Sequence, residues 1–386
     1  MTRSRKRLVA VFVLTAIAVG AWMALPLISS AAFLLDLGGQ QTTLRRILPV
    51  RRVAVRTDDL AIATRHGALA ARVYEPAVRH GLTIVVFPGV HGGGVDEPRM
   101  VKLSSQLAAT GARVVAVPLP DLRRYRLTPR STDMIEDAVA FVAADTRLAP
   151  EHEVGLVGVS FSGGLALVAA GRPALNGKVR AVVAIGAHAD LPRVMRYLCT
   201  GVLEDGSIRP PHDYGAAIML LHSLPKLVPS ADVPALDAAI VEFLDASSLA
   251  DTDSVAAARM VSALEVRTAT LPPASQKLMR AVLTRDVATL GPLLLPFVED
   301  VGGDAALSPA RSPASRAPAF LLHGADDNVI PTSENAPLAA YLAAAGTPAE
   351  RLVTPLLTHA SVASRRSAGD VWRLLRFWTS MRRALE

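Results

Sequence analysis

The chain has 386 residues, of which 51% are hydrophobic and 4% aromatic, with a formal net charge of +7 at pH 7. This length fits one large α/β domain with an insertion. The single cysteine, Cys199, excludes an intrachain disulfide and cysteine-rich zinc sites. Because no aromatic residues are interleaved with the basic ones, we expect no nucleic-acid partner, and at most a weak attraction to anionic lipids or acidic polymers.

The N-terminus combines a basic tail, residues 1–7, with residues 8–35, which carry no charged side chain. Since about 20 apolar residues span a bilayer, the second segment predicts a membrane anchor, with the following domain outside the cytoplasm. Ser-Ala-Ala at residues 30–32 resembles a signal-peptidase site, so a cleaved signal and secretion are the alternative. Arginines on both sides of the segment leave its orientation open. Residues 36–50 are expected to be a linker.

Apolar runs alternate with helical patterns through most of the remaining chain. An antiparallel pair is expected first, at residues 52–55 and 70–74. The strands of a mainly parallel sheet are expected at residues 82–87, 113–117, 154–157, 179–185, 319–322 and 351–355. Helices are expected at residues 99–110, 132–145, 163–170, 335–345 and 368–383. This alternation predicts an α/β fold with helices flanking the central sheet.

Residues 190–313 contain no strand pattern. Their helical patterns fall at residues 216–228, 236–249, 253–264, 275–285 and 287–297. We expect a helical cap inserted between two parts of one core, residues 51–189 and 314–386. Such a cap would lie at the edge of the sheet where open α/β sheets bind ligands. The alternative is an appendage that only stabilises the core.

The sequence EVGLVGVSFSGGLAL, residues 153–167, predicts a strand, a sharp turn with a serine at its tip, and a helix. Ser160 follows the strand directly and has Gly158 before it, so we favour Ser160 as a nucleophile. Ser162 stands where a second glycine is usual and offers a second register. A serine hydroxyl is a weak nucleophile until a base removes its proton, so the chemistry requires further groups.

Two downstream segments supply such groups. The sequence FLLHGADDNVIP, residues 320–331, places Asp326 and Asp327 after an apolar run, and LTHA, residues 357–360, places His359 after another. Asp190, which follows the run at residues 179–185, is a further candidate acid. A histidine can accept the serine proton, and a carboxylate holds its ring in one tautomer. Serine, acid and histidine in this chain order are the order described for α/β-hydrolases.

On these motifs, residues 82–378 resemble the α/β-hydrolase superfamily, in its esterase- and lipase-like branch. The family spacing His-Gly-x-x-Asp-x-x-[Val/Ile]-Pro implies Asp327 as the acid. The resemblance also implies that the backbone N–H of Phe161 forms half of an oxyanion hole. In PGVHGGG, residues 88–94, the second donor is Val90 if Pro-Gly replaces the family's His-Gly. Alternatively, His91 begins a lipase-type His-Gly-Gly-Gly loop, and its side chain could touch substrate.

No other chemistry is indicated. The histidines have no metal-ligand spacing, no dinucleotide fingerprint follows the first strand, and no Lys-Ser/Thr follows the glycines, so we expect no metal and no cofactor. The expected protein is a membrane-anchored serine hydrolase that cleaves a small-molecule or lipid-like ester through an acyl-enzyme. Thioesterases, acyltransferases and peptidases share this apparatus. A non-catalytic, membrane-tethered binding module is the alternative from another class.

Overall fold

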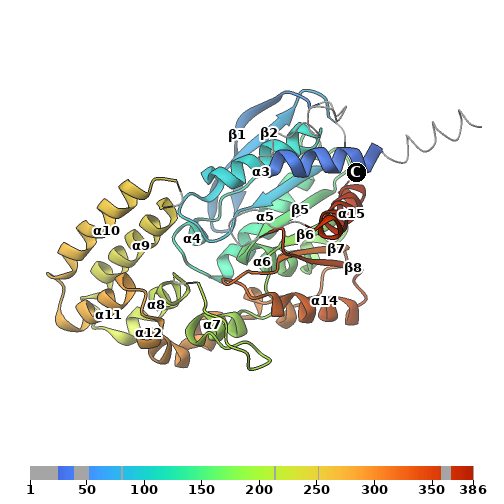
Figure 1. Ribbon diagram of the computed structural model, residues 1–386. Coiled ribbons are helices and arrows are strands. Elements are labelled where there is room, and N and C mark those ends of the chain that lie inside the picture. The colour runs from blue at the N-terminus through green and yellow to red at the C-terminus, as the bar shows by residue number, and fades with distance from the viewer. Residues whose placement is uncertain are drawn as a thin grey trace, which may run out of the picture.

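The computed structural model describes residues 25–38, 52–79, 81–212, 214–250, 252–357 and 367–385. Its centre is an eight-stranded sheet with the order β1-β2-β4-β3-β5-β6-β7-β8 (Figure 1). The strands are β1 (Val55–Thr64), β2 (Gly67–Pro76), β3 (Thr83–Phe87), β4 (Arg113–Ala116), β5 (Val154–Val159), β6 (Val179–Ile185), β7 (Ala319–Gly324) and β8 (Ala349–Thr354). The six strands predicted for the parallel sheet all form, within a few residues of the expected bounds.

Only the first edge of the sheet is antiparallel. β1 pairs antiparallel with β2 and β2 with β4, whereas β4, β3, β5, β6, β7 and β8 pair parallel. The predicted antiparallel pair therefore exists, but its first strand runs over Val55–Thr64 and not over residues 52–55. β1 is an edge strand with most side chains exposed, so it lacks the apolar run that marks a buried strand.

Helices cover both faces of the sheet. One face packs against α5 (Pro129–Ala144), α6 (Phe161–Ala170) and α14 (Asn335–Ala344), and the other against α3 (Pro98–Ala109) and α15 (Ala368–Leu385). Every residue of β3 is buried, as expected for a strand covered on both sides. The predicted fold class, a mainly parallel sheet flanked by helices, is confirmed. The short helix α4 (Pro120–Arg123) was not expected.

Residues 190–313, here called the helical insertion, form helices gathered beside the core (Figure 1). They are α7 (Leu191–Thr200), α8 (Tyr214–Leu227), α9 (Val233–Leu249), α10 (Ser254–Thr268), α11 (Pro273–Leu283), α12 (Val287–Leu294) and α13 (Val298–Gly302). Among its described residues no segment joins the sheet, and an isolated bridge links Val202 to Ile208. Five of these helices were predicted, whereas α7 and α13 were not. Whether the insertion acts as a cap stays a prediction.

Residues 25–37 form a helix that packs on α15. The Phe33 ring stacks on Trp378 with centroids 4.5 Å apart, and the Ser30 and Thr379 hydroxyl oxygens lie 3.0 Å apart. In the described part of the chain, no helix combines the length and apolar character needed to cross a membrane. Residues 8–24 of the predicted anchor lie outside that part. Residues 25–35 of the predicted anchor belong to the helix that packs on α15.

Candidate active site

Ser160 occupies a sharp turn between β5 and α6. Its backbone has φ 59° and ψ −132°, a left-handed conformation that costs a residue with a β-carbon about 1–3 kcal/mol. The Ser160 N–H donates to the Ile185 carbonyl over 2.7 Å, which ties the turn to the end of β6. A β-carbon on Gly158 would stand 2.5 Å from the Ser162 carbonyl oxygen, so only glycine lets the strand and helix approach this closely. The fold therefore holds Ser160 in a strained position.

Ser162 is fully buried, and its hydroxyl is used within the turn. Its Oγ accepts the Val159 N–H over 2.9 Å and lies 2.9 Å from the carbonyl oxygens of Phe87 and Val159. One proton serves those two carbonyls, so this hydroxyl already has its full set of partners. By contrast, no hydrogen bond is recorded for the Ser160 hydroxyl among the described residues. The geometry therefore favours Ser160 over Ser162 as the reactive group.

The loop after β3 lies against the serine turn. A β-carbon on Gly89 would stand 2.9 Å from the Ser160 Cβ. Phe161 is the first residue of α6, where an N–H has no acceptor within the helix. Within the described chain, neither this N–H nor that of Val90 has a recorded hydrogen-bond partner. Both predicted oxyanion donors therefore lie near Ser160 and have unused N–H groups.

The glycine loop after Val90 is linked to the helical insertion through Tyr125. The Gly92 N–H donates to the Tyr125 hydroxyl over 3.3 Å, and this hydroxyl donates to Asp245 Oδ1, on α9, over 2.7 Å. Tyr125 is buried and has a positive φ of 58°. Burial, aided by the Asp245 carboxylate, raises its pKa well above the usual range. Sequence reasoning missed Tyr125 and Asp245, because no local pattern marks a tyrosine with positive φ.

His91 stands within this loop and stabilises it. Its Nδ1 accepts the Gly93 N–H over 3.0 Å. This bond leaves Nδ1 unprotonated and fixes the tautomer of a neutral ring. A contact between His91 and a substrate stays a prediction.

Asp327 lies buried at the carboxyl end of β7, with 2% of its surface exposed. Its Oδ1 accepts the N–H groups of Val329 and Ile330 at 2.9 and 3.0 Å. A β-carbon on Gly186 would stand 3.3 Å from Asp327 Oδ2. Gly186 follows Ile185, whose carbonyl binds the Ser160 N–H. Ser160 and Asp327 therefore both lie against the end of β6, at Ile185 and Gly186 respectively.

The other candidate acids have structural roles. The Asp326 side chain is 75% exposed and pairs with Arg209 at 3.2 Å. Asp190 caps α7 by accepting the Arg193 N–H over 3.1 Å, and it pairs with Arg311 at 2.6 Å. These contacts account for both carboxylates, and they favour Asp327 as the acid.

His359 lies outside the described residues, so its side chain cannot be placed. The last described residue before it is Leu357, two residues away. β8 lies beside β7, with Thr354 opposite Gly324. Because parallel neighbours end at one edge of a sheet, the chain leaves β8 on the side where Asp327 follows β7. The assignment of His359 as the base stays a prediction.

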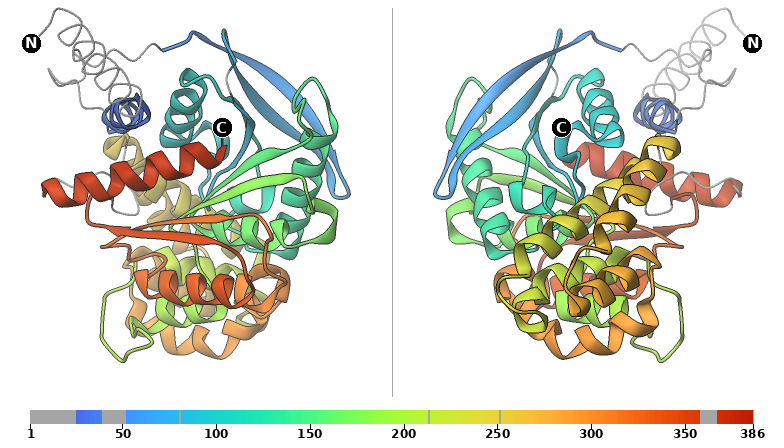
Figure 2. Two further views of the ribbon diagram at one scale, coloured as in Figure 1. Left: turned by 90° about the vertical axis from the view of Figure 1, so that its right-hand side faces the viewer. Right: turned by 90° about the vertical axis from the view of Figure 1, so that its left-hand side faces the viewer.

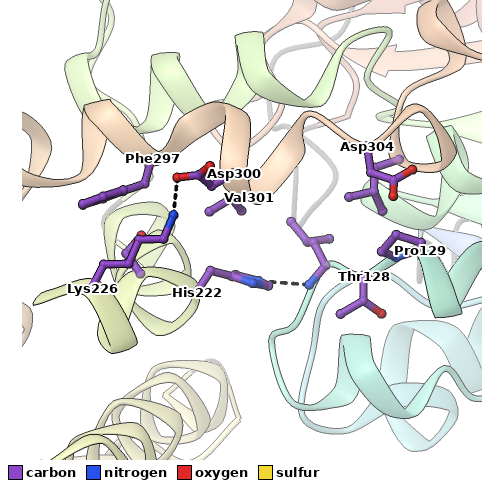
Figure 3. A pocket seen from close by; sticks show the side chains of 11 residues that line it. Thr128, Pro129, His222, Lys226, Phe297, Asp300, Val301 and Asp304 are labelled. Atoms are coloured by element: carbon purple, nitrogen blue, oxygen red, sulfur yellow. Dashed lines mark hydrogen bonds and ion pairs between the residues drawn. The ribbon is translucent and has the colours of Figure 1, made fainter. Parts of the chain in front are cut away.

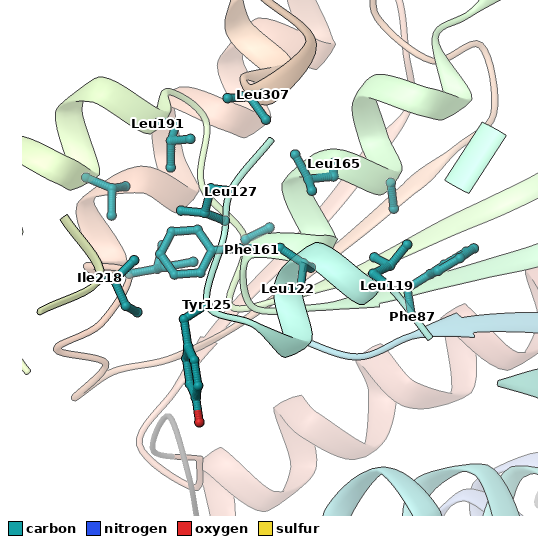
Figure 4. Packing of buried hydrophobic residues seen from close by; sticks show 14 of the residues in the cluster. Phe87, Leu119, Leu122, Tyr125, Leu127, Phe161, Leu165, Leu191, Ile218 and Leu307 are labelled. Carbon is teal, nitrogen blue, oxygen red and sulfur yellow. The ribbon is translucent and has the colours of Figure 1, made fainter. Parts of the chain in front are cut away.

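A pocket of about 310 Å³ lies between the core and the helical insertion (Figure 3). In it, His222 Nε2 accepts the Leu127 N–H over 3.1 Å, and Lys226 pairs with Asp300 at 2.5 Å. Ser160 does not line this pocket. The Phe161 side chain packs in an apolar cluster with Leu127 and its neighbours (Figure 4). The pocket is therefore separate from the serine turn.

The described residues contain no group of three or more His, Cys, Asp or Glu side chains that could hold a metal ion.

The strand order, the antiparallel first edge and the strand–serine–helix turn after β5 define an α/β-hydrolase fold. Among the solved structures similar to this chain are several described as esterases. They include an esterase from Pyrobaculum calidifontis (18% identity, 93% of this chain and 92% of that chain, TM-score 0.48) and a thermostable carboxylesterase cloned from a metagenomic library (19%, 93% and 95%, 0.46). An arylesterase is 14% identical over 87% of this chain and 86% of its own, with a TM-score of 0.49.

No family model and no curated protein matches the sequence. Similarities this distant do not assign an activity.

Proposed function

We propose that the chain is a serine hydrolase that cleaves carboxylic esters. The observation that carries the proposal is the contrast between two neighbouring hydroxyls: that of Ser162 is fully bonded, whereas that of Ser160 is held at a strained turn without a recorded partner. Two unused backbone N–H groups lie beside it, at Phe161 and Val90. Such a set is what acyl transfer through a serine nucleophile requires.

In the proposed reaction, the Ser160 oxygen attacks the ester carbonyl while His359 takes the hydroxyl proton. The N–H groups of Phe161 and Val90 bind the resulting oxyanion, and each such donor contributes roughly 10²–10³ in kcat. His359 then returns the proton to the leaving alcohol, which leaves the acyl group on Ser160. Water, deprotonated by His359, attacks this ester and releases the acid. Asp327 holds the imidazole in one tautomer and stabilises its charged form.

We also propose that the helical insertion, residues 190–313, caps this site between core segments 51–189 and 314–386. The support is the contact from Asp245 on α9, through the Tyr125 hydroxyl, to the Gly92 N–H. An insertion of mostly apolar helices next to the reacting groups favours a hydrophobic, lipid-like ester. Thioesters, amides and acyl transfer would use the same groups, and a substrate screen distinguishes them.

We further propose that residues before Leu25 tether the protein to a membrane, with the catalytic domain outside the cytoplasm. Cleavage after Ala32 would be the route to secretion. Ser30 and Ala32 are both buried, and the Ser30 hydroxyl lies 3.0 Å from that of Thr379 on α15, a contact that cleavage would remove. Their burial supports the uncleaved form. Detection of the N-terminal peptide by mass spectrometry in protein from cell membranes tests this, and a mature chain that begins at Phe33 would contradict it.

The test of the hydrolase is labelling of the full-length chain in detergent by a fluorophosphonate, with the adduct located by mass spectrometry. Wild type and Ser162→Ala should be labelled on Ser160, and Ser160→Ala should not be labelled. An adduct on Ser162 would overturn the register. No labelling of folded wild type would favour the non-catalytic binding module.

A second assay then uses unlabelled enzyme with aryl esters of increasing acyl length. Adding an acceptor alcohol measures the ratio of transfer to hydrolysis. Ester hydrolysis that is lost in Ser160→Ala is the expected result. Transfer that exceeds hydrolysis would reassign the protein as an acyltransferase.

A further inference from the structure

The outward face of α15 carries exposed aromatic and basic side chains. The inward face, with Phe377 and Trp378 among others, is buried against the sheet and the helix of residues 25–37. The opposite face exposes Trp372, which is 50% accessible, together with Arg376 and Arg383. These residues recur at spacings of four and seven, so they lie along one side of the helix. A protein surface that displays a tryptophan together with arginines is typical of a membrane interface.

Two arginines of this face, Arg376 and Arg383, are not neutralised by any protein group in the described part of the chain. Arg373 pairs with Asp370, within the first turns of α15. Glu350 accepts a hydrogen bond from the Ser380 hydroxyl over 2.6 Å. For Arg376 and Arg383, no ion pair is recorded with any described residue. Two guanidinium groups and an indole are therefore displayed to the surroundings.

The N-terminal helix points out on the same side of the molecule. In Figure 1 its residue-25 end extends beyond α15, and the left view of Figure 2 shows α15 crossing the face turned to the viewer, with this helix above it nearly end-on. Leu25, at its outer end, is 51% exposed. Residues 8–24, which precede it, contain no charged side chain. The outer end of this helix, at Leu25, therefore lies on the side that α15 occupies.

We propose that the outward face of α15 lies on the headgroup layer of a membrane that contains anionic lipids, beside the point where the N-terminal segment enters it. The indole of Trp372 suits the boundary between headgroups and acyl chains, where tryptophan is enriched. Arg376 and Arg383 attract anionic headgroups, and each raises the equilibrium constant for docking on the membrane about fivefold at low salt. The contact fixes the orientation of the domain on the membrane. It does not depend on the hydrolase activity.

The test places an environment-sensitive thiol fluorophore on full-length protein reconstituted into vesicles. Trp372→Cys reports on the α15 face. The matched control is Val266→Cys, because the Val266 side chain lies on α10 and is 72% exposed. Cys199 is buried and its thiol pKa is raised to about 12, so wild type should take up little label at neutral pH. Quenching by a nitroxide-bearing lipid measures proximity to the bilayer.

In vesicles of phosphatidylglycerol, the label at position 372 should shift to the blue and be quenched at least threefold more than the label at 266. Arg376→Glu with Arg383→Glu, or 0.5 M salt, should remove most of that quenching. Equal quenching at the two positions would overturn the proposal. Quenching at 372 that persists unchanged in pure phosphatidylcholine would overturn the role of the arginines. A blue shift at 372 without lipid quenching would reassign the face to a protein contact and also overturn it.

Discussion

Gly89 lies so close to Ser160 that a β-carbon on the glycine would stand 2.9 Å from the serine Cβ and 3.6 Å from its Oγ. This contact joins the loop after β3 to the turn after β5. The two strands are parallel neighbours, with Phe87 paired to Gly158, so their carboxyl ends share one edge of the sheet. The proposed oxyanion site depends on that approach, because its two donors come from the two connections.

Replacement of Gly89 by alanine should therefore impair catalysis more than folding. The added methyl group pushes the loop away from Ser160 and displaces the Val90 N–H, so kcat for ester hydrolysis should fall roughly 10²–10³-fold. KM should change little. Gly369→Ala is the control, since Gly369 lies in the exposed first turn of α15 and a β-carbon there would stand 3.8 Å from the Ser367 hydroxyl oxygen. A kcat for Gly89→Ala within threefold of wild type would contradict the assignment.

The two adjacent aspartates should behave differently. Asp327→Asn keeps the shape of the buried side chain but removes its charge, so kcat should fall by about 10⁴, as expected when a triad carboxylate is lost. Asp326→Asn should stay within twofold of wild type, because its side chain is exposed. Steady-state kinetics of both variants decide between them, and a large loss only in Asp326→Asn would move the acid by one residue.

Ser162→Ala should reduce stability while Ser160 remains reactive. The substitution leaves the Val159 N–H and nearby carbonyl groups without their partner in a fully buried site. The cost of such unsatisfied groups is about 1–3 kcal/mol in the free energy of unfolding. Urea denaturation measures this loss. Unchanged stability would show that the hydroxyl contributes little to the turn.

The link from α9 to the glycine loop predicts an effect on the turnover rate. Tyr125→Phe keeps the ring but removes the hydroxyl that joins the Gly92 N–H to Asp245. The unpaired groups cost about 1–2 kcal/mol, so kcat should fall roughly tenfold if the loop positions the oxyanion donor. Tyr341→Phe, which removes a hydroxyl bonded to the Ser312 carbonyl, should lower stability alone. Equal kcat values in the two variants would argue against the link.

His222 predicts a loss of stability in mild acid. Burial and the nearby Arg126 charge lower its pKa to about 4 from the usual 6.5. Below pH 6.5 the unfolded state takes up a proton that the folded state refuses, so stability falls as the pH drops from 6.5 toward 4. The full loss in the free energy of unfolding is about 3 kcal/mol. His222→Gln should flatten this dependence in urea titrations at pH 7 and pH 4.5, and an unchanged slope would contradict it.

Sequence patterns predicted the parallel strands and the serine turn, because the signals for both are local. A strand covered on both faces is an apolar run, and the glycines at residues 158, 163 and 164 mark a crowded crossing of strand and helix. The edge strand β1 was placed too early, since its exposed residues show no such run. Residues 25–35 of the predicted membrane segment form a helix that packs on α15, and a helix that packs on protein can be as apolar as one that packs on lipid.

The sequence by itself determined the fold class and the order of the candidate residues, since periodicity and chain order are properties of neighbouring positions. Only the tertiary structure decided that Ser162 is bonded to the backbone, that Asp326 is exposed and Asp327 buried, and that Tyr125 joins the glycine loop to α9. Those outcomes depend on contacts between segments far apart in the chain. No local pattern encodes which carbonyl, carboxylate or helix a side chain will meet once the sheet has closed.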